Sequence, residues 1–248
     1  MSAVLVAGGA TGIGAAAVRA FCDRGDRVLL ADRNAEAGRA LVAALPDDRV
    51  AFVECDFEDA GAVTEAVQSA TEFHSGALDV VFYNAAVLEA HALAEWTVRA
   101  WDRSTAVNLR APFLMAQAAA PQLRASDCGR FIVTSSTGAF RGHAGMPAYH
   151  ATKSGLLGLV RALADEWGPD GVTVNAVCPG WVDTPFNDGF WAHQPDAGQA
   201  LQLLESQIPL RRQAMPDEVT GLLLFLASAA SAYVTGQALV IDGGYTAV

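Results

Sequence analysis

Short, continuous apolar runs recur along the chain and are separated by longer stretches with helical periodicity. Each run is rich in Val, Ile, Leu or Phe, which is the pattern of a strand that helices cover on both faces. The predicted strands are Ala3–Ala7, Val28–Ala31, Val50–Val53, Leu78–Phe82, Phe131–Thr134, Val172–Val177 and Ala238–Ile241.

The intervening stretches are long enough to hold the helices that connect parallel strands. They include Ile13–Cys22, Ala35–Leu45, Ala60–Phe73, Trp96–Leu123 and Ala148–Trp167. This alternation predicts an α/β fold in which residues 1–248 form a single Rossmann domain. We expect a doubly wound, parallel, seven-stranded sheet with helices on both faces.

One segment departs from the alternation. Residues 185–213 are polar and aromatic, and Gly189, Pro195, Gly198 and Pro209 interrupt them. A long irregular excursion in such a fold is often a lid over the site, so we expect a substrate lid here.

Composition narrows the function. The chain of 248 residues has a net charge of −11 and a pI of about 4.7, so electrostatics disfavour nucleic-acid and membrane partners. No basic and apolar leader opens the sequence, and its four cysteines have no metal-binding spacing. We therefore expect a cytoplasmic protein with free thiols and no metal site.

The first predicted strand leads into a turn with the spacing G-x-x-x-G-x-G, formed by Gly8, Gly12 and Gly14. Glycines let the backbone approach a pyrophosphate closely, and the following helix offers its N-terminal N–H groups. Between a first strand and a first helix, this turn predicts a dinucleotide site.

Asp32 ends the second strand, where a carboxylate can accept both hydroxyls of an adenosine ribose and repel a 2′-phosphate. The neighbouring Arg33 could instead bind that phosphate. We favour NAD over NADP because a fixed carboxylate disfavours the phosphate more than a mobile arginine favours it. Asp56 ends the third strand and could bind adenine or cap the helix that starts near Asp59.

Tyr149 and Lys153 are four residues apart in a predicted helix and so share a face. Lys153 is the only lysine among 16 basic residues, which indicates a position where arginine would fail. A phenol is a poor base at neutral pH, and a nearby ammonium favours its ionised form. We therefore expect Tyr149 to be the acid/base, with a pKa that Lys153 lowers.

Two further candidates lie near strand ends. Ser136 follows the fifth strand and could hold a substrate oxygen, although Ser135 is a rival that strand parity cannot exclude. Pro112 lacks the N–H that would bond the carbonyl of Asn108 in a continuous helix. Either the helix kinks there and frees that carbonyl for a proton-relaying water, or Pro112 lies in the first turn of a new helix.

Together these residues resemble the short-chain dehydrogenase/reductase family, in its compact branch of about 250 residues, over Val4 to Gly244. Asn108, Ser136, Tyr149 and Lys153 fall at the positions of its catalytic tetrad. The resemblance extends to Asn175-Ala176-Val177-Cys178-Pro179-Gly180 and Ile241-Asp242-Gly243-Gly244. Where the family often has Asn-Asn-Ala-Gly, this chain has Tyr83-Asn84-Ala85-Ala86.

The candidate ligand-binding residues come from the patterns above and from the resemblance, and those for the substrate come mainly from the aromatic residues of the predicted lid. The cofactor residues are Gly8, Thr11, Gly12, Ile13, Gly14, Asp32, Arg33, Asp56, Phe57, Asn84, Ala85, Ala86, Tyr149, Lys153, Pro179, Gly180, Val182 and Thr184. The candidate substrate residues are Ser136, His143, Trp181, Phe186, Phe190 and Trp191.

The expected function is hydride transfer between NAD(H) and a secondary alcohol or ketone, with an apolar or cyclic substrate favoured by the aromatic lid. One alternative is an NADP-linked reductase of 3-oxoacyl thioesters. Another is a non-catalytic nucleotide-sensing protein, against which the four filled tetrad positions argue. The resemblance also implies a homotetramer, and apolar residues around more than one face of the helix at Leu156–Leu163 fit a partner surface.

Overall fold

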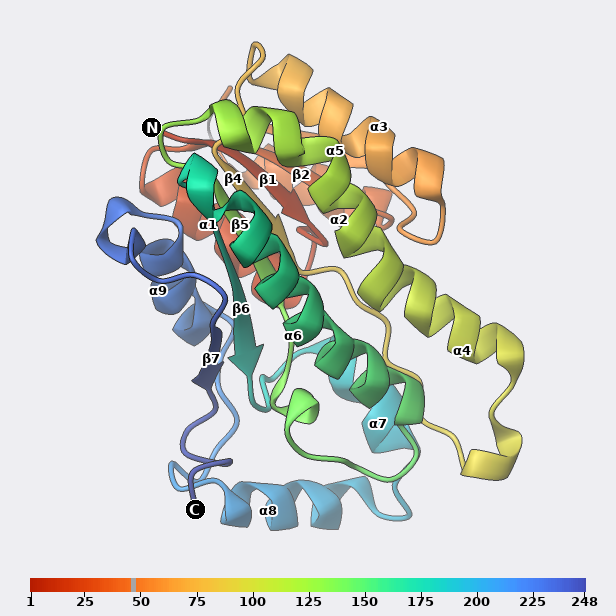
Figure 1. The fold of residues 1–248 in the computed structure, drawn as a ribbon. Helices are drawn as coiled ribbons and strands as arrows, with labels where there is room; N and C mark the ends of the chain where they lie inside the picture. Colours follow the sequence, from red (N-terminus) through yellow and green to blue (C-terminus); the bar gives the residue numbers. More distant parts are fainter. Residues whose placement is uncertain (46–47) are drawn as a thin grey trace.

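The computed structural model describes residues 1–45 and 48–248, and its centre is one parallel sheet (Figure 1). Within these residues seven strands pair in the order β3-β2-β1-β4-β5-β6-β7, which confirms the predicted fold class. The strands are β1 (Ala3–Ala7), β2 (Arg27–Asp32), β3 (Val50–Glu54), β4 (Val80–Tyr83), β5 (Arg130–Thr134), β6 (Thr173–Pro179) and β7 (Ala238–Ile241).

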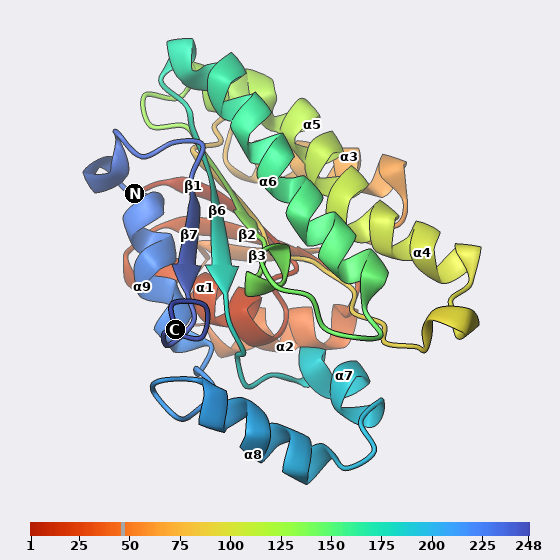
Figure 2. The same ribbon diagram turned by 60° about the horizontal axis from the view of Figure 1, so that its bottom comes forward.

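Helices cover both faces of this sheet (Figure 2). One face carries α3 (Ala60–Phe73), α5 (Ala111–Ala125) and α6 (Pro147–Trp167), with α4 (Val98–Thr105) extending that layer. The other carries α1 (Gly12–Asp23), α2 (Ala35–Ala44) and α9 (Asp217–Leu226). Two apolar cores therefore lie above and below the strands, as a doubly wound sheet requires.

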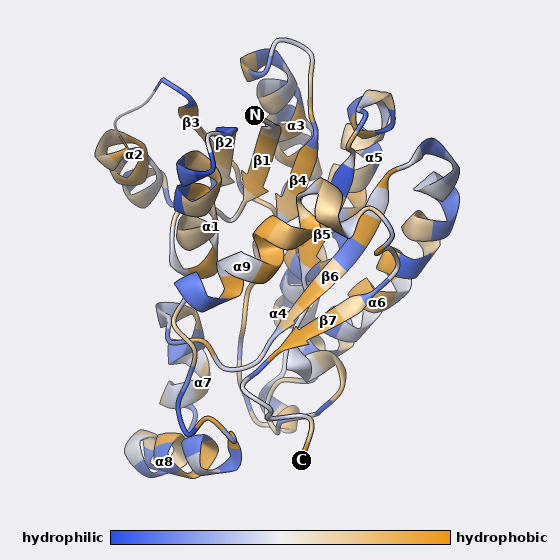
Figure 3. Cartoon of the chain, turned by 90° about the vertical axis from the view of Figure 1, so that its left-hand side faces the viewer, coloured by the Kyte–Doolittle hydropathy of each residue, from blue (hydrophilic) through white to orange (hydrophobic). Residues whose placement is uncertain are grey.

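The strands are apolar because both of their faces are buried. Every residue of β1 is buried, and Val4 and Val6 belong to one core whereas Leu5 and Ala7 belong to the other. The hydropathy colouring shows mainly apolar strands, helices of mixed polarity and a largely apolar α9 (Figure 3). In the described part of the chain, no helix is both long and apolar enough to cross a membrane.

Residues 185–213 are mostly helical, so the expectation of an irregular excursion was wrong. They contain α7 (Asp188–Ala192) and α8 (Ala197–Gln207), and the Asp196 side chain caps α8 by accepting a hydrogen bond from the Gln199 N–H at 2.9 Å. Good helix formers follow this cap, which explains the helix despite the nearby proline and glycine. Both helices lie beyond the carboxyl end of β6 (Figure 2).

The apolar residues of α6 are largely covered by the chain itself. Leu156, Leu157 and Val160 are buried, and only Leu159 and Leu163 remain half-buried. This helix therefore gives little support to the partner surface that its sequence suggested.

Candidate active site

A cavity of about 460 Å³ opens at the carboxyl edge of the sheet. Its wall includes all the predicted cofactor residues except Gly14, together with Ser136, Tyr149 and Lys153. Ligands of doubly wound sheets bind at this edge, where the strand order reverses between β1 and β4. The structure thus brings residues from most of the chain's length into one site.

The glycine turn has the shape that a dinucleotide requires. Gly8 and Gly12 have φ angles of 74° and 54°, values that favour glycine. A Cβ on Gly12 would point toward the cavity-lining Thr184 and lie 3.1 Å from its Cγ2. Gly14 lies behind the turn, where a Cβ would overlap the Gly8 carbonyl. Gly8 and Gly14 are therefore required by close packing within the protein, and the missing side chain of Gly12 leaves the cavity side of the turn open, which fits a dinucleotide.

Asp32 is held in place at the end of β2. Its carboxylate accepts hydrogen bonds from the Ala10 N–H at 3.0 Å and the Asn34 N–H at 2.9 Å, and it lines the cavity. Arg33 also lines the cavity but is exposed. Asp56 lines the cavity too, whereas Asp59 caps α3.

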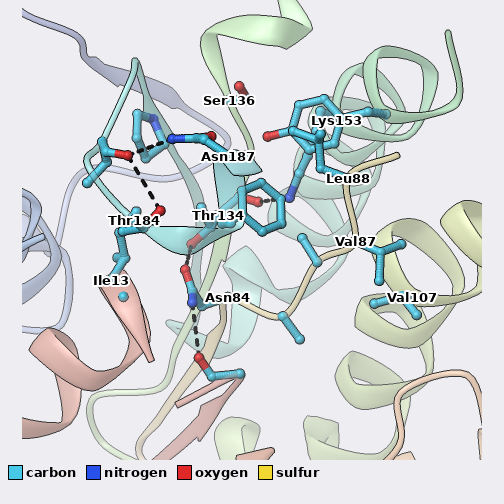
Figure 4. Close-up of a pocket in the computed structure, with 18 of the residues that line it drawn as sticks. Ile13, Asn84, Val87, Leu88, Val107, Thr134, Ser136, Lys153, Thr184 and Asn187 are labelled. Carbon is cyan, nitrogen blue, oxygen red and sulfur yellow. Dashed lines mark hydrogen bonds between the residues drawn. The ribbon is translucent and has the colours of Figure 1, made fainter. Parts of the chain in front are cut away.

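A hydrogen-bonded chain connects the glycine turn to Lys153 (Figure 4). The Asn84 side chain donates to the Gly8 carbonyl at 3.1 Å and accepts from the Thr134 hydroxyl at 2.9 Å. The Lys153 ammonium donates to the Thr134 carbonyl at 2.7 Å. Asn84 therefore fixes the ends of β1 and β5 relative to each other. The end of β1 carries the glycine turn, and the end of β5 holds Lys153.

Tyr149 and Lys153 lie together as predicted, with Nζ 5.7 Å from the phenol ring centroid. Burial nevertheless raises the pKa of Tyr149 to about 12, and the hydrogen bond to Ser136 lowers it only partly. Burial also lowers the pKa of Lys153 to about 7. In the chain alone the pKa of Tyr149 is therefore above its ordinary value because the phenol is buried, and the lowering of that pKa by Lys153 stays a prediction.

The two serines after β5 have different surroundings. The Ser135 hydroxyl is buried and donates to the Lys153 carbonyl at 2.8 Å, which holds α6 against β5. The Ser136 hydroxyl accepts from the Gly138 N–H at 2.9 Å, lines the cavity and lies close enough to Tyr149 to lower the pKa of the phenol. The structure therefore favours Ser136 over Ser135 as the group next to the acid/base.

Asn108 lies behind the cavity wall, fully buried in a π-helical turn over Ala106–Arg110. This turn connects α4 to α5 and places Pro112 in the first turn of α5, which confirms the second of the two alternatives, whereas a proton-relaying water at the Asn108 carbonyl stays a prediction. The Asn108 side chain accepts from the Val87 N–H at 2.8 Å and donates to the Val87 carbonyl at 2.9 Å and to Thr152. It braces the loop after β4 against α6.

The predicted substrate residues divide into two groups. His143, Trp181 and Phe186 line the cavity beside Ser136. Phe190 and Trp191 do not line it but pack against Trp181, with ring centroids 4.8 Å and 5.3 Å from that indole. They form a second layer that supports the wall.

Sequence reasoning missed several residues of this site. Met146, His150 and Thr137 line the cavity, and the buried Tyr245 hydrogen-bonds His143. His150 directly follows Tyr149, and this proximity is a signal that could have identified it. Tyr245 lies 102 positions from His143, and no local pattern connects the two.

The fold, the glycine turn and the Ser136–Tyr149–Lys153 cluster define an oxidoreductase of the dinucleotide-binding class. A family model described as enoyl-(acyl carrier protein) reductase matches residues 8–246. D-Threitol dehydrogenase of Mycolicibacterium smegmatis is 39% identical over 98% of this chain and 92% of its own length. A probable galactose dehydrogenase of Rhizobium meliloti is 37% identical over 97% and 93%.

Among solved structures, levodione reductase superposes with a TM-score of 0.93 at 29% identity, covering 99% of this chain and 97% of that one. The chain therefore belongs to the short-chain dehydrogenase/reductase family, whose members bind a nicotinamide cofactor. D-Threitol dehydrogenase, the probable galactose dehydrogenase and a cis-4-hydroxycyclohexanecarboxylate dehydrogenase of Sinomonas cyclohexanicum are each named for a hydroxyl-bearing substrate.

Proposed function

We propose that the chain is an NAD(H)-linked dehydrogenase that interconverts a cyclic or apolar secondary alcohol and its ketone. The observation that carries the proposal is the placement of Ser136, Tyr149 and Lys153 around one end of a cavity whose other end carries the glycine turn and Asp32. This arrangement supports a substrate carbinol next to an acid/base and next to the cofactor.

An oxidised nicotinamide, once bound, would supply the hydride acceptor and a positive charge. Ser136 holds the substrate oxygen, and Tyr149 takes the hydroxyl proton as the hydride leaves the carbinol carbon. Lys153, whose Nζ lies 5.7 Å from the phenol ring centroid, adds positive charge while it is protonated, at and below its lowered pKa of about 7. In the reverse direction Tyr149 donates its proton to the carbonyl oxygen, a role that its raised pKa suits in the chain alone.

The preference for NAD rests on Asp32. Because two backbone N–H groups hold its carboxylate at the cavity wall, a 2′-phosphate there would meet a negative charge that cannot move away. The rival NADP-linked thioester reductase would have to use the exposed Arg33. Comparing kcat/KM with NAD and NADP distinguishes the two, and a preference for NADP would refute the assignment.

The wall residues support a cyclic substrate. Trp181 and Phe186 present aromatic surfaces to the cavity, with Phe190 and Trp191 behind Trp181. Flat apolar walls favour a ring over a short flexible chain because less rotational freedom is lost on binding. α7 and α8 would form the lid that closes this side.

The test is a panel of cyclic and linear secondary alcohols, assayed by the absorbance of reduced nicotinamide. Tyr149→Phe should lower kcat by about 10² to 10⁴ while the affinity for NAD persists. Near-normal turnover in that variant would refute the role of Tyr149. Binding of NAD without turnover of any alcohol or ketone would favour a nucleotide-sensing protein.

We also propose a homotetramer in the cytoplasm, as membership of the family and the acidic, cysteine-poor composition suggest. Large apolar side chains are exposed on α4, α5 and β7, including Trp101 at 44%, Phe113 at 46% and Val240 at 43%. Surfaces of this kind favour contact with further copies. Light scattering that shows a monomer at micromolar concentration would refute the proposal.

A further inference from the structure

His143 places a polar group in the otherwise aromatic part of the cavity wall. Its imidazole is half-buried and has aromatic rings on several sides. The ring centroids of Trp181, His150, Phe190 and Tyr245 lie 5.5, 5.5, 6.2 and 6.5 Å from its own. A polar atom in such a setting has strong directional effects because little water competes with it.

The position of His143 is fixed from two sides. Its backbone N–H donates to Nε2 of His150 at 2.8 Å, and Nδ1 of His150 lies 2.8 Å from the Gly138 carbonyl. His150 therefore accepts at Nε2 and donates from Nδ1 to the Gly138 carbonyl, which fixes the orientation of its ring. On the other side, Nε2 of His143 lies 3.2 Å from the Tyr245 hydroxyl.

Tyr245 is itself anchored at the end of the chain. It is 2% exposed, and Arg141 donates to its carbonyl at 3.1 Å with the guanidinium 4.2 Å from its ring centroid. Asp242 holds the preceding turn by accepting hydrogen bonds from the Gly244 and Thr246 N–H groups, both at 2.8 Å. The hydroxyl that meets His143 therefore cannot easily turn away.

This arrangement leaves one nitrogen of the imidazole available. Among the described residues Nδ1 of His143 has no hydrogen-bond partner, and it is not one of the fully buried polar atoms. His150 is a neighbour of both Tyr149 and His143, with its ring centroid 5.9 Å from that of Tyr149 and 5.5 Å from that of His143, and all three residues line the cavity. A small ring seated against Tyr149 can therefore carry a second oxygen toward His143.

We infer, on the basis of the dehydrogenase function proposed above, that His143 is a specificity-determining residue that hydrogen-bonds a second hydroxyl of the substrate. The preferred substrates are then cyclic diols or polyols rather than alcohols with a single oxygen. A hydroxyl fits because it both donates and accepts, so it pairs with Nδ1 whichever nitrogen carries the imidazole proton.

A carboxylate fits this position less well. Burial, with His150 and Arg141 nearby, lowers the pKa of His143 to about 4, so the imidazole is neutral at physiological pH. It therefore provides no positive charge, and the net charge of −11 disfavours anions further. The chemistry of the site selects a neutral polyol over a hydroxy acid.

The test compares cyclohexanol with the 1,2-, 1,3- and 1,4-cyclohexanediols in the intact enzyme with NAD. The wild type should favour at least one diol by about tenfold in kcat/KM, the effect of one additional buried hydrogen bond. His143→Phe should bring the ratio of kcat/KM for that diol to kcat/KM for cyclohexanol down to about one. His91→Phe is the control, because His91 contacts Glu89 and Trp96 away from the cavity and should leave the ratio unchanged.

Equal losses on cyclohexanol and on the diols in His143→Phe would show a packing role and overturn the inference, as would a wild type without any diol preference. Failure to oxidise any alcohol would instead overturn the proposed function. Binding then still tests His143: with NAD present, a diol should raise the Tm of Tyr149→Phe more than cyclohexanol does. In the double variant that also carries His143→Phe, the diol and cyclohexanol should raise the Tm equally. Equal rises already in the Tyr149→Phe single variant would refute the inference.

Discussion

Lys153 gives a quantitative prediction, because it is a buried ammonium whose main partner is a backbone carbonyl. The side chain is 2% exposed and Nζ donates to the Thr134 carbonyl at 2.7 Å. Burial lowers its pKa from 10.5 to about 7. A shift of this size corresponds to a cost of about 5 kcal/mol for keeping the group charged in the folded state.

The sign follows from proton binding. Between pH 7 and 10.5 the unfolded chain holds a proton on Lys153 that the folded chain has lost, so stability rises with pH in this window. Lys153→Met has no ionisable group at this position, so its stability lacks this dependence on pH. The free energy of unfolding of the wild type, minus that of the variant, should therefore rise by about 1.4 kcal/mol per pH unit.

The assay is urea unfolding at pH 7.5, 8.5 and 9.5 and one protein concentration, followed by tryptophan fluorescence. The difference should grow by about 3 kcal/mol over this range. Tyr149 does not interfere, because its raised pKa is common to both proteins and acts only at higher pH. Arg161→Met, at an exposed position of the same helix, is the control and should show no pH-dependent difference. A constant difference for Lys153→Met would show that the ammonium stays charged in the fold and would refute the reasoning.

Three further predictions follow from the same structure. Asp32→Ser removes the fixed carboxylate but keeps Arg33, so the ratio of kcat/KM with NADP to kcat/KM with NAD should rise by at least about tenfold. An unchanged ratio would contradict the role of Asp32 in excluding NADP. Alcohol oxidation should accelerate as pH rises, because the pKa of Tyr149 lies above neutrality and its base form becomes more populated. A kcat/KM for alcohol oxidation that does not change between pH 6 and 9 would contradict Tyr149 as the base. Tyr83→Phe should lower the free energy of unfolding by about 1 to 3 kcal/mol, because the buried Tyr83 hydroxyl donates to the Val107 carbonyl at 2.6 Å. An unchanged free energy of unfolding in urea would show that this hydrogen bond contributes nothing to stability.

The parts of the fold that could be predicted are those specified by burial over short distances. β1 and β7 have the predicted bounds because their apolar runs end abruptly at glycine or acidic residues. The glycine turn and the Tyr149–Lys153 pair could be found because both are local spacings. Helix α8 could not, because its cap at Asp196 is one signal among several helix-breaking residues.

The electrostatics of the site could not be read from the sequence. The spacing of Tyr149 and Lys153 shows that they are neighbours, but the direction of each pKa shift depends on how deeply the fold buries both groups. The choice between Ser135 and Ser136 likewise depends on which hydroxyl α6 covers. Tyr83 illustrates a different limit: it departs from the family's usual amide, and only the structure shows that its hydroxyl reaches the π-helical turn beside Asn108.

The central claim is that Tyr149 exchanges the proton while a hydride moves between the substrate carbon and the cofactor. It is tested most directly with a cyclic secondary alcohol deuterated at its carbinol carbon, by following deuterium into the cofactor by mass spectrometry. The wild type should transfer the label to NAD, and Tyr149→Phe should bind NAD equally well but transfer deuterium at least about a hundredfold more slowly. Transfer at the wild-type rate by Tyr149→Phe, or no transfer by the wild type to either NAD or NADP, would contradict the account.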